Sequence, residues 1–249
     1  MNIVVFDTET TSIEKPFTYN IGYCIINAET GKTLVERDYV VEQIWHNMAL
    51  FSTAYYAEKR PIYVEAMRRR MAVLDKFGYI CRQMKNDFKR YEVTGAYAYN
   101  SPFDERVFDF NTDWFKCNNP FEDIPIYDIR GYVHEFLVDT DYKDFCDTHG
   151  YYTAGGNYSS TAETVYRYIT GDITFDEAHT ALADSRIEAE ILLKCIERGA
   201  TWGKDYPIMK SIEKRTLRTL TIRDRAKTYH RFDFEKIMIS KDKTKIYLS

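Results

Sequence analysis

The 249-residue sequence has few cysteines, and their placement argues against two common uses of this residue. The cysteines are odd in number, and no two of them form a Cys-x-x-Cys pair: Cys24, Cys81, Cys117, Cys146 and Cys195. A disulfide framework needs paired cysteines in an oxidising compartment, and structural zinc sites use closely spaced cysteine ligands. We therefore expect neither, and we expect a protein of the reducing cytoplasm.

Long hydrophobic runs are absent as well. The first apolar run, residues 3–6, has no basic lead before it, so it lacks the form of a signal peptide. No window reaches the roughly 18 apolar residues of a membrane span, so we expect no membrane partner. Apolar residues still make up 45% of the chain, which is enough to predict a globular protein with a sizeable core.

Aromatic residues are plentiful, and charge is unevenly distributed. The chain holds 21 Tyr and 15 Phe; most must be buried, and an exposed surplus would offer stacking surfaces for bases. Residues 1–198 carry 21 Lys and Arg against 32 Asp and Glu, whereas residues 199–249 carry 13 against 6. A basic tail on an acidic body suggests a polyanionic partner, and a solvated helix face is the equally weighted alternative.

The hydrophobic patterns predict strands first and then an alternation of strands and helices. Residues 2–6 read as a buried central strand, and a turn at Gly31 joins two further strands. The block 42–92, which follows these strands, is expected to be mainly helical. The predicted strands are 2–6, 20–27, 33–41, 94–99 and 124–129, and the predicted helices are 62–75, 79–91, 131–138, 141–148, one from Ser160 to Gly171, and 184–198. The clearest domain boundary is expected near Gly199.

Three short patterns place acidic or histidine side chains at the ends of these elements. Asp7 and Glu9 alternate along a strand, so both can project from one face. Asp104 falls in the first turn of a helix that follows a strand, and His179 lies five residues before Asp184, where another helix is expected to begin. Each has a plain structural alternative: two solvated acids for the first, a carboxylate that complements a helix dipole for the second, and a packed histidine with an N-capping aspartate for the third.

Taken together and in this order, the patterns resemble the DEDDh branch of the DnaQ-like exonucleases, within the ribonuclease-H-like superfamily. The three motifs of that family are similar to Asp7-Thr8-Glu9-Thr10-Thr11, to Asn100 with Phe103-Asp104, and to His179 with Asp184. The resemblance covers about residues 1–198. It implies an α/β fold with a mixed central sheet flanked by helices. The block 42–92 would be a helical insertion, and residues 199–249 a basic extension of unknown role. Ser12 and Tyr99 depart from the usual Gly and His.

The resemblance also implies phosphodiester hydrolysis with two Mg²⁺ or Mn²⁺ ions, for which oxygen ligands are suited. Asp7 would bridge both ions, and Glu9 and Asp184 would complete the site of the attacking water. Asp104 would serve the ion that faces the leaving 3′ oxygen. His179 would take the proton from the water, because its ordinary pKa of about 6.5 suits a base near neutral pH. The products would be nucleoside 5′-monophosphates.

The expected substrate is the 3′ end of single-stranded DNA or RNA, and no residue pattern chooses between them. Thr10, Thr11 and Asn100 are candidates for contact with the terminal nucleotide, and Phe103 is a candidate for packing near a base. The basic runs at 68–70, 82–90 and 210–231 are candidates for phosphate contacts.

Three other functions stay open. A non-catalytic nucleic-acid-binding module is disfavoured because all five active-site positions are filled. A metal-dependent endonuclease of the same superfamily would release internal fragments. A proofreading subunit would dock on a replication polymerase through the apolar residues of the tail: Leu217, Leu220, Ile222, Ile237 and Ile239.

Overall fold

The computed structural model describes residues 1–213, 237–239 and 246–248, with side chains described for 1–213. The chain divides into two compact units. The first comprises Met1–Tyr151 and Ser159–Lys210 and contains every predicted catalytic and metal-binding residue, and the second comprises Tyr152–Tyr158 and Ser211–Ser249. The division into an exonuclease domain, residues 1–198, and a basic extension, residues 199–249, stays a prediction.

A mixed sheet of six strands forms the centre of the first unit, in the order β4-β3-β2-β1-β5-β6. Its strands are β1 (Asn2–Thr10), β2 (Thr18–Asn27), β3 (Thr33–Val41), β4 (Val73–Asp75), β5 (Val93–Ala98) and β6 (Ile126–Asp128). The pairs β1–β2 and β2–β3 are antiparallel, whereas β1–β5, β3–β4 and β5–β6 are parallel. The predicted α/β class with a mixed central sheet is confirmed.

Strand β1 is central because its apolar run, residues 3–6, is buried, as expected for a strand covered on both faces. The strand continues past the predicted end at residue 6 to Thr10, and it pairs with β2 along this whole length. Asp7 and Glu9 therefore stand at alternate positions inside a paired strand, which fixes their relative placement.

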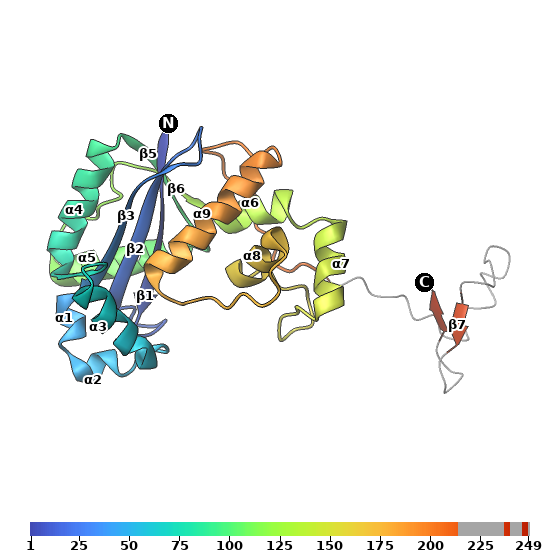
Figure 1. Ribbon diagram of the computed structural model, residues 1–249, viewed down its shortest axis with the longest axis horizontal. Coiled ribbons are helices and arrows are strands. Elements are labelled where there is room, and N and C mark those ends of the chain that lie inside the picture. The colour runs from blue at the N-terminus through green and yellow to red at the C-terminus, as the bar shows by residue number, and fades with distance from the viewer. Residues whose placement is uncertain (214–236, 240–245, 249) are drawn as a thin grey trace. The chain divides into compact units, whose positions relative to one another are not determined.

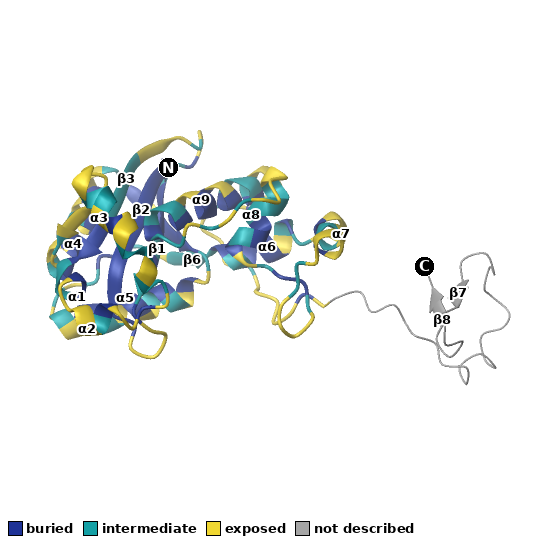
Figure 2. Ribbon diagram, turned by 60° about the horizontal axis from the view of Figure 1, so that its bottom comes forward, coloured by how far each residue is buried: buried dark blue, intermediate teal, exposed yellow. Residues whose placement is uncertain are grey.

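Helices cover both faces of the sheet (Figure 1). Helices α4 (Phe77–Arg90) and α5 (Ser101–Phe115) lie on one face. Helix α9 (Ala181–Glu197) crosses the other and packs on β1 and β2, with α6 (Ile129–Phe136) and α8 (Ala162–Thr170) beside it and α7 (Thr140–His149) beyond. Buried residues concentrate in the sheet and in the inner sides of these helices (Figure 2). Among the described residues, no helix combines the length and apolarity that crossing a membrane requires.

The block 42–92 contains mostly helices, with one unpredicted strand. Its elements are α1 (Glu42–Trp45), α2 (Met48–Phe51), the 3₁₀ helix η1 (Ala57–Lys59), α3 (Arg60–Arg68), β4 and α4. The predicted helix over 62–75 was wrong beyond Arg68, because the backbone turns left-handed at Arg70 (φ 58°) and then joins the sheet as β4.

In the second unit, the backbone N–H of Tyr158 donates to the carbonyl of Ile212 at 3.0 Å. Strand β7 (Ile237–Ile239) pairs antiparallel with β8 (Ile246–Leu248). The tail residues Leu217, Leu220 and Ile222 lie outside the described residues, so their predicted docking role stays a prediction.

Candidate active site

Three of the four predicted metal-binding carboxylates meet where α9 begins against the sheet. Asp7 and Glu9 come from β1, and Asp184 comes from the first turn of α9. One oxygen from each of the three side chains lies within 4.8 Å of the others. Residues that are far apart in sequence therefore form one acidic group.

A glycine in β2 allows this close approach. Gly22 is the strand partner of Asp7, and α9 begins directly over it. A Cβ atom built on Gly22 would lie 2.0 Å from the backbone nitrogen of Leu182, so any larger residue would displace the helix. The absence of a side chain at Gly22 thus lets α9 bring Asp184 close to Asp7.

The start of α9 differs from the prediction. The helix begins at Ala181, with Thr180 as its N-cap residue, so the alternative in which Asp184 caps the helix was wrong. The side chain of Asn20, on β2, accepts a hydrogen bond from the backbone N–H of Ala181 at 2.8 Å. One free donor at the helix start is therefore satisfied by the sheet, which leaves the Asp184 carboxylate available.

Asp104, the fourth predicted ligand, is buried in the first turn of α5. It accepts a hydrogen bond of 2.6 Å from the hydroxyl of Thr8, so β1 and α5 are tied together next to Asp7. Burial, and then the charge of Asp7, raises the pKa of Asp104 well above its usual range.

The other carboxyl groups are also shifted toward their neutral forms. Burial and then Glu177 raise the pKa of Asp7 to about 7. Burial, then Asp7 and Glu177, raises the pKa of Asp184 to about 9. Burial, then Asp7 and Asp184, raises the pKa of Glu9. Buried acids that oppose one another's ionisation are typical of a functional site, and a bound cation would reverse these shifts.

The donor set fits a hard divalent cation. The Oδ1 atom of Asp184 is buried and has no hydrogen-bond partner, which is costly for a carboxylate oxygen unless another group binds it. Asp7, Glu9 and Asp184 offer only oxygen, the ligand that Mg²⁺ and Mn²⁺ prefer.

His179 adjoins this acidic group in the loop that precedes α9. Atoms of Glu177, His179 and Asp184 form a second group within 4.8 Å of one another, so Asp184 belongs to both. Burial and then the charge of Lys59 lower the pKa of His179, which favours a neutral imidazole that can accept a proton near pH 7.

Two further carboxylates were missed by the sequence reasoning. Glu188 lies one helical turn after Asp184 and is buried; burial, then Asp7 and Asp104, raises its pKa. Its position four residues after Asp184, on the same helix face, is the signal that could have found it. Glu177 lies two residues before His179, and burial followed by Glu163 raises its pKa to about 7.

Solved structures share this arrangement of elements. The nuclease domain of 3′hExo, a DEDDh family member, in its structure bound to rAMP, aligns with a TM-score of 0.53 at 13% identity over 84% of this chain and 96% of that one. A 3′-exonuclease from a structure of 3′-end-specific recognition of a histone mRNA stem-loop aligns with a TM-score of 0.56 at 12% identity over 86% and 95%. This chain has the fold of a DEDDh exonuclease domain.

Exonuclease I of E. coli, in complex with a dA16 oligonucleotide, also aligns with this DEDDh exonuclease fold. Its TM-score is 0.51 at 13% identity, over 80% of this chain and 41% of that one. By sequence, neither a family model nor a curated protein matches the chain. Identities this low show the fold alone, so the chemistry has to be argued from the chain's own side chains.

In this DEDDh-type fold, the second-motif residues lie at the start of α5. Asn100 adopts a left-handed conformation (φ 67°), and its side chain accepts a hydrogen bond from Arg130 at 3.0 Å. Phe103 is half-buried, and the guanidinium of Arg106 lies 5.3 Å from its ring centre. The nucleotide contacts of Asn100 and Phe103 stay predictions.

The two threonines after Glu9 differ in accessibility. Thr10 is half-buried and its hydroxyl donates to the carbonyl of Ser12, whereas Thr11 is buried and its hydroxyl donates to the carbonyl of Lys15. A contact between the Thr11 side chain and a nucleotide would require this loop to rearrange. The roles predicted for both threonines stay predictions.

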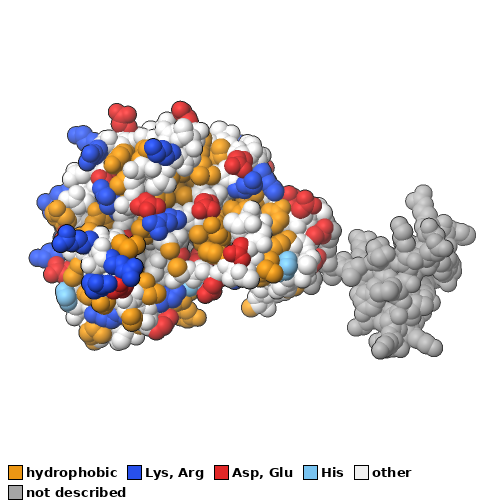
Figure 3. Space-filling model, viewed as in Figure 1, with side chains coloured by type: hydrophobic (Ala, Val, Ile, Leu, Met, Phe, Trp, Pro, Cys, Tyr) orange, Lys and Arg blue, Asp and Glu red, His pale blue; other side chains and the backbone are white. Residues whose placement is uncertain are grey.

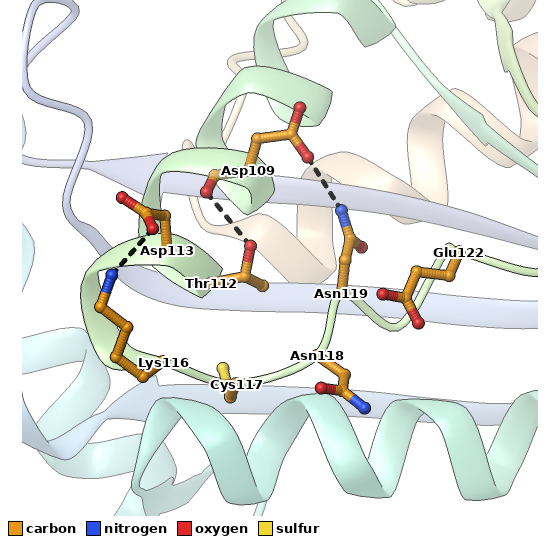
Figure 4. Close-up of a pocket in the computed structure, with 8 residues that line it drawn as sticks. All are labelled: Asp109, Thr112, Asp113, Lys116, Cys117, Asn118, Asn119 and Glu122. Atoms are coloured by element: carbon orange, nitrogen blue, oxygen red, sulfur yellow. Dashed lines mark hydrogen bonds and ion pairs between the residues drawn. The ribbon is translucent and has the colours of Figure 1, made fainter.

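An open pocket at the end of α5 contains none of the predicted site residues (Figure 4). Its lining is Asp109, Thr112, Asp113, Lys116, Cys117, Asn118, Asn119 and Glu122. Lys116 pairs with Asp113 at 2.9 Å, and the Asn119 side chain donates to Asp109 at 3.1 Å. None of the residues that line this pocket belongs to the acidic groups that could hold a metal ion in the described part of the chain.

Proposed function

We propose that this chain is a metal-dependent 3′→5′ exonuclease acting on the 3′ end of single-stranded DNA or RNA. The convergence of Asp7, Glu9 and Asp184 within 4.8 Å carries the proposal, with Asp104 beside Asp7 and His179 beside Asp184. The fold supports it, because the similar solved structures include exonucleases described with rAMP, a stem-loop mRNA and a dA16 oligonucleotide.

In the proposed mechanism, the carboxylates of Asp7, Glu9, Asp104 and Asp184 would hold two Mg²⁺ or Mn²⁺ ions. When bound, such ions supply a reactive water near neutral pH and stabilise charge on the attacking and leaving oxygens. His179 accepts one proton from the attacking water. The new bond joins the water oxygen to phosphorus, the bond to the 3′ oxygen breaks, that oxygen takes up a proton from solvent to become the new 3′-hydroxyl, and a nucleoside 5′-monophosphate leaves.

Basic side chains on the surface are partly neutralised by their neighbours. Several groups of Lys and Arg side chains lie scattered over the side of the molecule formed by α3 and α4 (Figure 3). Arg68 and Arg69 both pair with Glu65, however, and Lys85 lies 3.0 Å from Asp123. Such ion pairs compete with phosphate, so contacts from the runs 68–70 and 82–90 stay predictions that salt dependence can test.

The test uses matched 5′-labelled single-stranded DNA, duplex DNA and RNA, incubated with Mg²⁺, Mn²⁺ or chelator. We expect a ladder that shortens from the 3′ end with either ion and no cleavage with chelator. Asp7→Ala should abolish cleavage, whereas Asp113→Ala, an exposed aspartate at the end of α5, should keep it.

Each competing function gives a different result in this assay. Internal fragments from a substrate with a blocked 3′ end would identify an endonuclease. Binding without cleavage under every metal condition would identify a binding module. No feature of the described residues favours a polymerase partner, and co-purification with a polymerase would be needed to support that prediction.

A further inference from the structure

The helical block 42–92 reaches the loop that carries His179. The Tyr56 ring, next to η1, stacks on the imidazole of His179, with ring centres 4.3 Å apart and planes within 13°. Burial, then Glu9 and Tyr55, raises the pKa of Tyr56 to about 12, and Asp184 contributes as well. The Tyr56 ring therefore covers the imidazole of His179, which has an atom within 4.8 Å of a carboxylate oxygen of Asp184.

Lys59, three residues later, ties the same two segments together. Its Nζ atom donates a hydrogen bond of 2.5 Å to the carbonyl of Ala178, the residue before His179. The same Nζ atom lies 4.6 Å from the centre of the Tyr56 ring. A charged hydrogen bond to the backbone and a cation–π contact thus hold the loop and the ring side by side.

The backbone at His179 needs such support. Its φ of 48° lies in the left-handed region, which costs a non-glycine residue of the order of 1–3 kcal/mol. In this conformation a ring nitrogen of His179 lies within 4.8 Å of a carboxylate oxygen of Asp184. The strained turn therefore places the imidazole next to a proposed metal ligand, and it persists only where surrounding contacts hold it.

We infer that Tyr56 is a positioning residue that holds the His179 imidazole in place for proton transfer, so that the helical block forms part of the active site. The inference rests on the proposed function, in which His179 is the base. At one edge of the imidazole, the Nδ1 atom lies 3.6 Å from Oε2 of Glu177. The ring is thus covered on one face by Tyr56, and one of its edges faces Glu177.

The kinetic test compares Tyr56→Ala with Tyr56→Phe in the full chain. Tyr56→Ala should lower kcat about 10- to 100-fold with little change in KM, because a misplaced catalytic group costs rate rather than substrate binding. Tyr56→Phe keeps the stacked ring and should restore the lost turnover. Tyr79→Ala, which removes an exposed ring from α4 in the same block, serves as the matched control. Equal losses in Tyr56→Ala and Tyr56→Phe would overturn the inference, because they would assign the effect to the hydroxyl.

Two further measurements separate positioning from general damage. In a His179→Ala background, Tyr56→Ala should cause no additional loss, because both changes disable the same group; additive losses would overturn the inference. In the metal-free chain, the NMR signals of the His179 ring protons should move downfield in Tyr56→Ala, because a stacked aromatic ring shields them. Unmoved signals would also overturn it. The NMR measurement needs no activity, so an inactive wild-type chain would contradict the proposed function alone.

Discussion

His179 and the four carboxylates have separable tasks at the scale of single residues. His179→Ala removes the proposed proton acceptor and leaves Asp7, Glu9, Asp104 and Asp184 in place. We expect turnover to fall about 10²–10⁴-fold, the usual contribution of a general base, with unchanged affinity for Mn²⁺ and for an oligonucleotide. Single-turnover kinetics and calorimetry would measure these quantities, with His149→Ala, an exposed histidine on α7, as control. Undiminished turnover would refute the role of His179.

The raised pKa values of the acidic group predict a pH-dependent stability of the metal-free chain. The pKa is raised from 3.8 to about 7 for Asp7 and to about 9 for Asp184. The folded state therefore binds protons that the unfolded state releases near pH 4. The stabilisation is complete below pH 4 and is lost as pH rises through 7 and 9. Each tenfold difference in proton affinity between the two states corresponds to about 1.4 kcal/mol of unfolding free energy.

The measurement is the melting temperature in chelator from pH 5 to pH 9. It should fall with rising pH, and Mn²⁺ should remove the fall because a bound cation replaces the protons and stabilises the folded state. Asp184→Asn should flatten the profile in chelator, whereas Asp113→Asn should leave it as in the wild type. A flat wild-type profile in chelator would show that these carboxyl groups do not oppose one another's ionisation.

The residues of the site differ in how far the sequence predicts them. Asp7 and Glu9 are predictable as a pair, because alternation along a strand is a local property. Asp104 and Asp184 needed the family resemblance, because no local rule brings two helices to one strand. The role of Tyr56 could not be predicted from the sequence, because its contact with His179 depends on how the segment around η1 packs against a loop more than a hundred residues away.

At the scale of elements, the sequence predicted the helices and strands that have a long hydrophobic pattern. It failed for a short strand that forms only because it pairs with a neighbour. The apolar run of β1 and the buried face of α9 were sufficient to predict a central strand and a helix, although both elements are longer than expected. Strand β4 has only three residues, Val73–Asp75, and it exists because it pairs with β3. Such a strand leaves no periodic signal, because its stabilising contacts are tertiary.

The contact between β2 and α9 gives the prediction at this scale. Gly22→Ala would place a Cβ atom 2.0 Å from the Leu182 nitrogen, so the helix must move away from the sheet. We expect a loss of about 1–3 kcal/mol or more of unfolding free energy, together with lower activity, because Asp184 moves with the helix. Urea unfolding and the exonuclease assay would measure the two effects. Gly155→Ala, whose nearest atoms lie 3.9 Å away, should be close to neutral, and an equally neutral Gly22→Ala would contradict the described packing.

At the scale of the whole molecule, the proposed function requires an acidic site to bind a polyanionic substrate, so the distribution of basic residues matters. Residues 1–198 carry an excess of acidic groups, and the proposed active site adds buried carboxylates that repel phosphate. Bound divalent cations would offset this repulsion locally. Along the rest of a nucleic-acid strand, basic residues would have to offset the repulsion of the phosphates. Residues 199–249 hold 13 of the 34 Lys and Arg residues in the chain.

Neutralising basic residues in the full chain would show which of them contact phosphate. The tail variant carries Arg223→Ser, Arg225→Ser and Lys227→Ser, and the comparison variant carries Arg82→Ser, Lys89→Ser and Arg90→Ser on α4. Affinity falls with salt, and for single strands each phosphate contact adds about 0.7 to the steepness of log affinity against log salt. Three lost contacts should therefore make the dependence shallower by about 2. We expect this change in the tail variant, measured by fluorescence anisotropy at several salt concentrations. If only the α4 variant shows this change, the nucleic acid lies along the helical block and not along the tail. Unchanged slopes in both variants would mean that these residues are ordinary solvated surface.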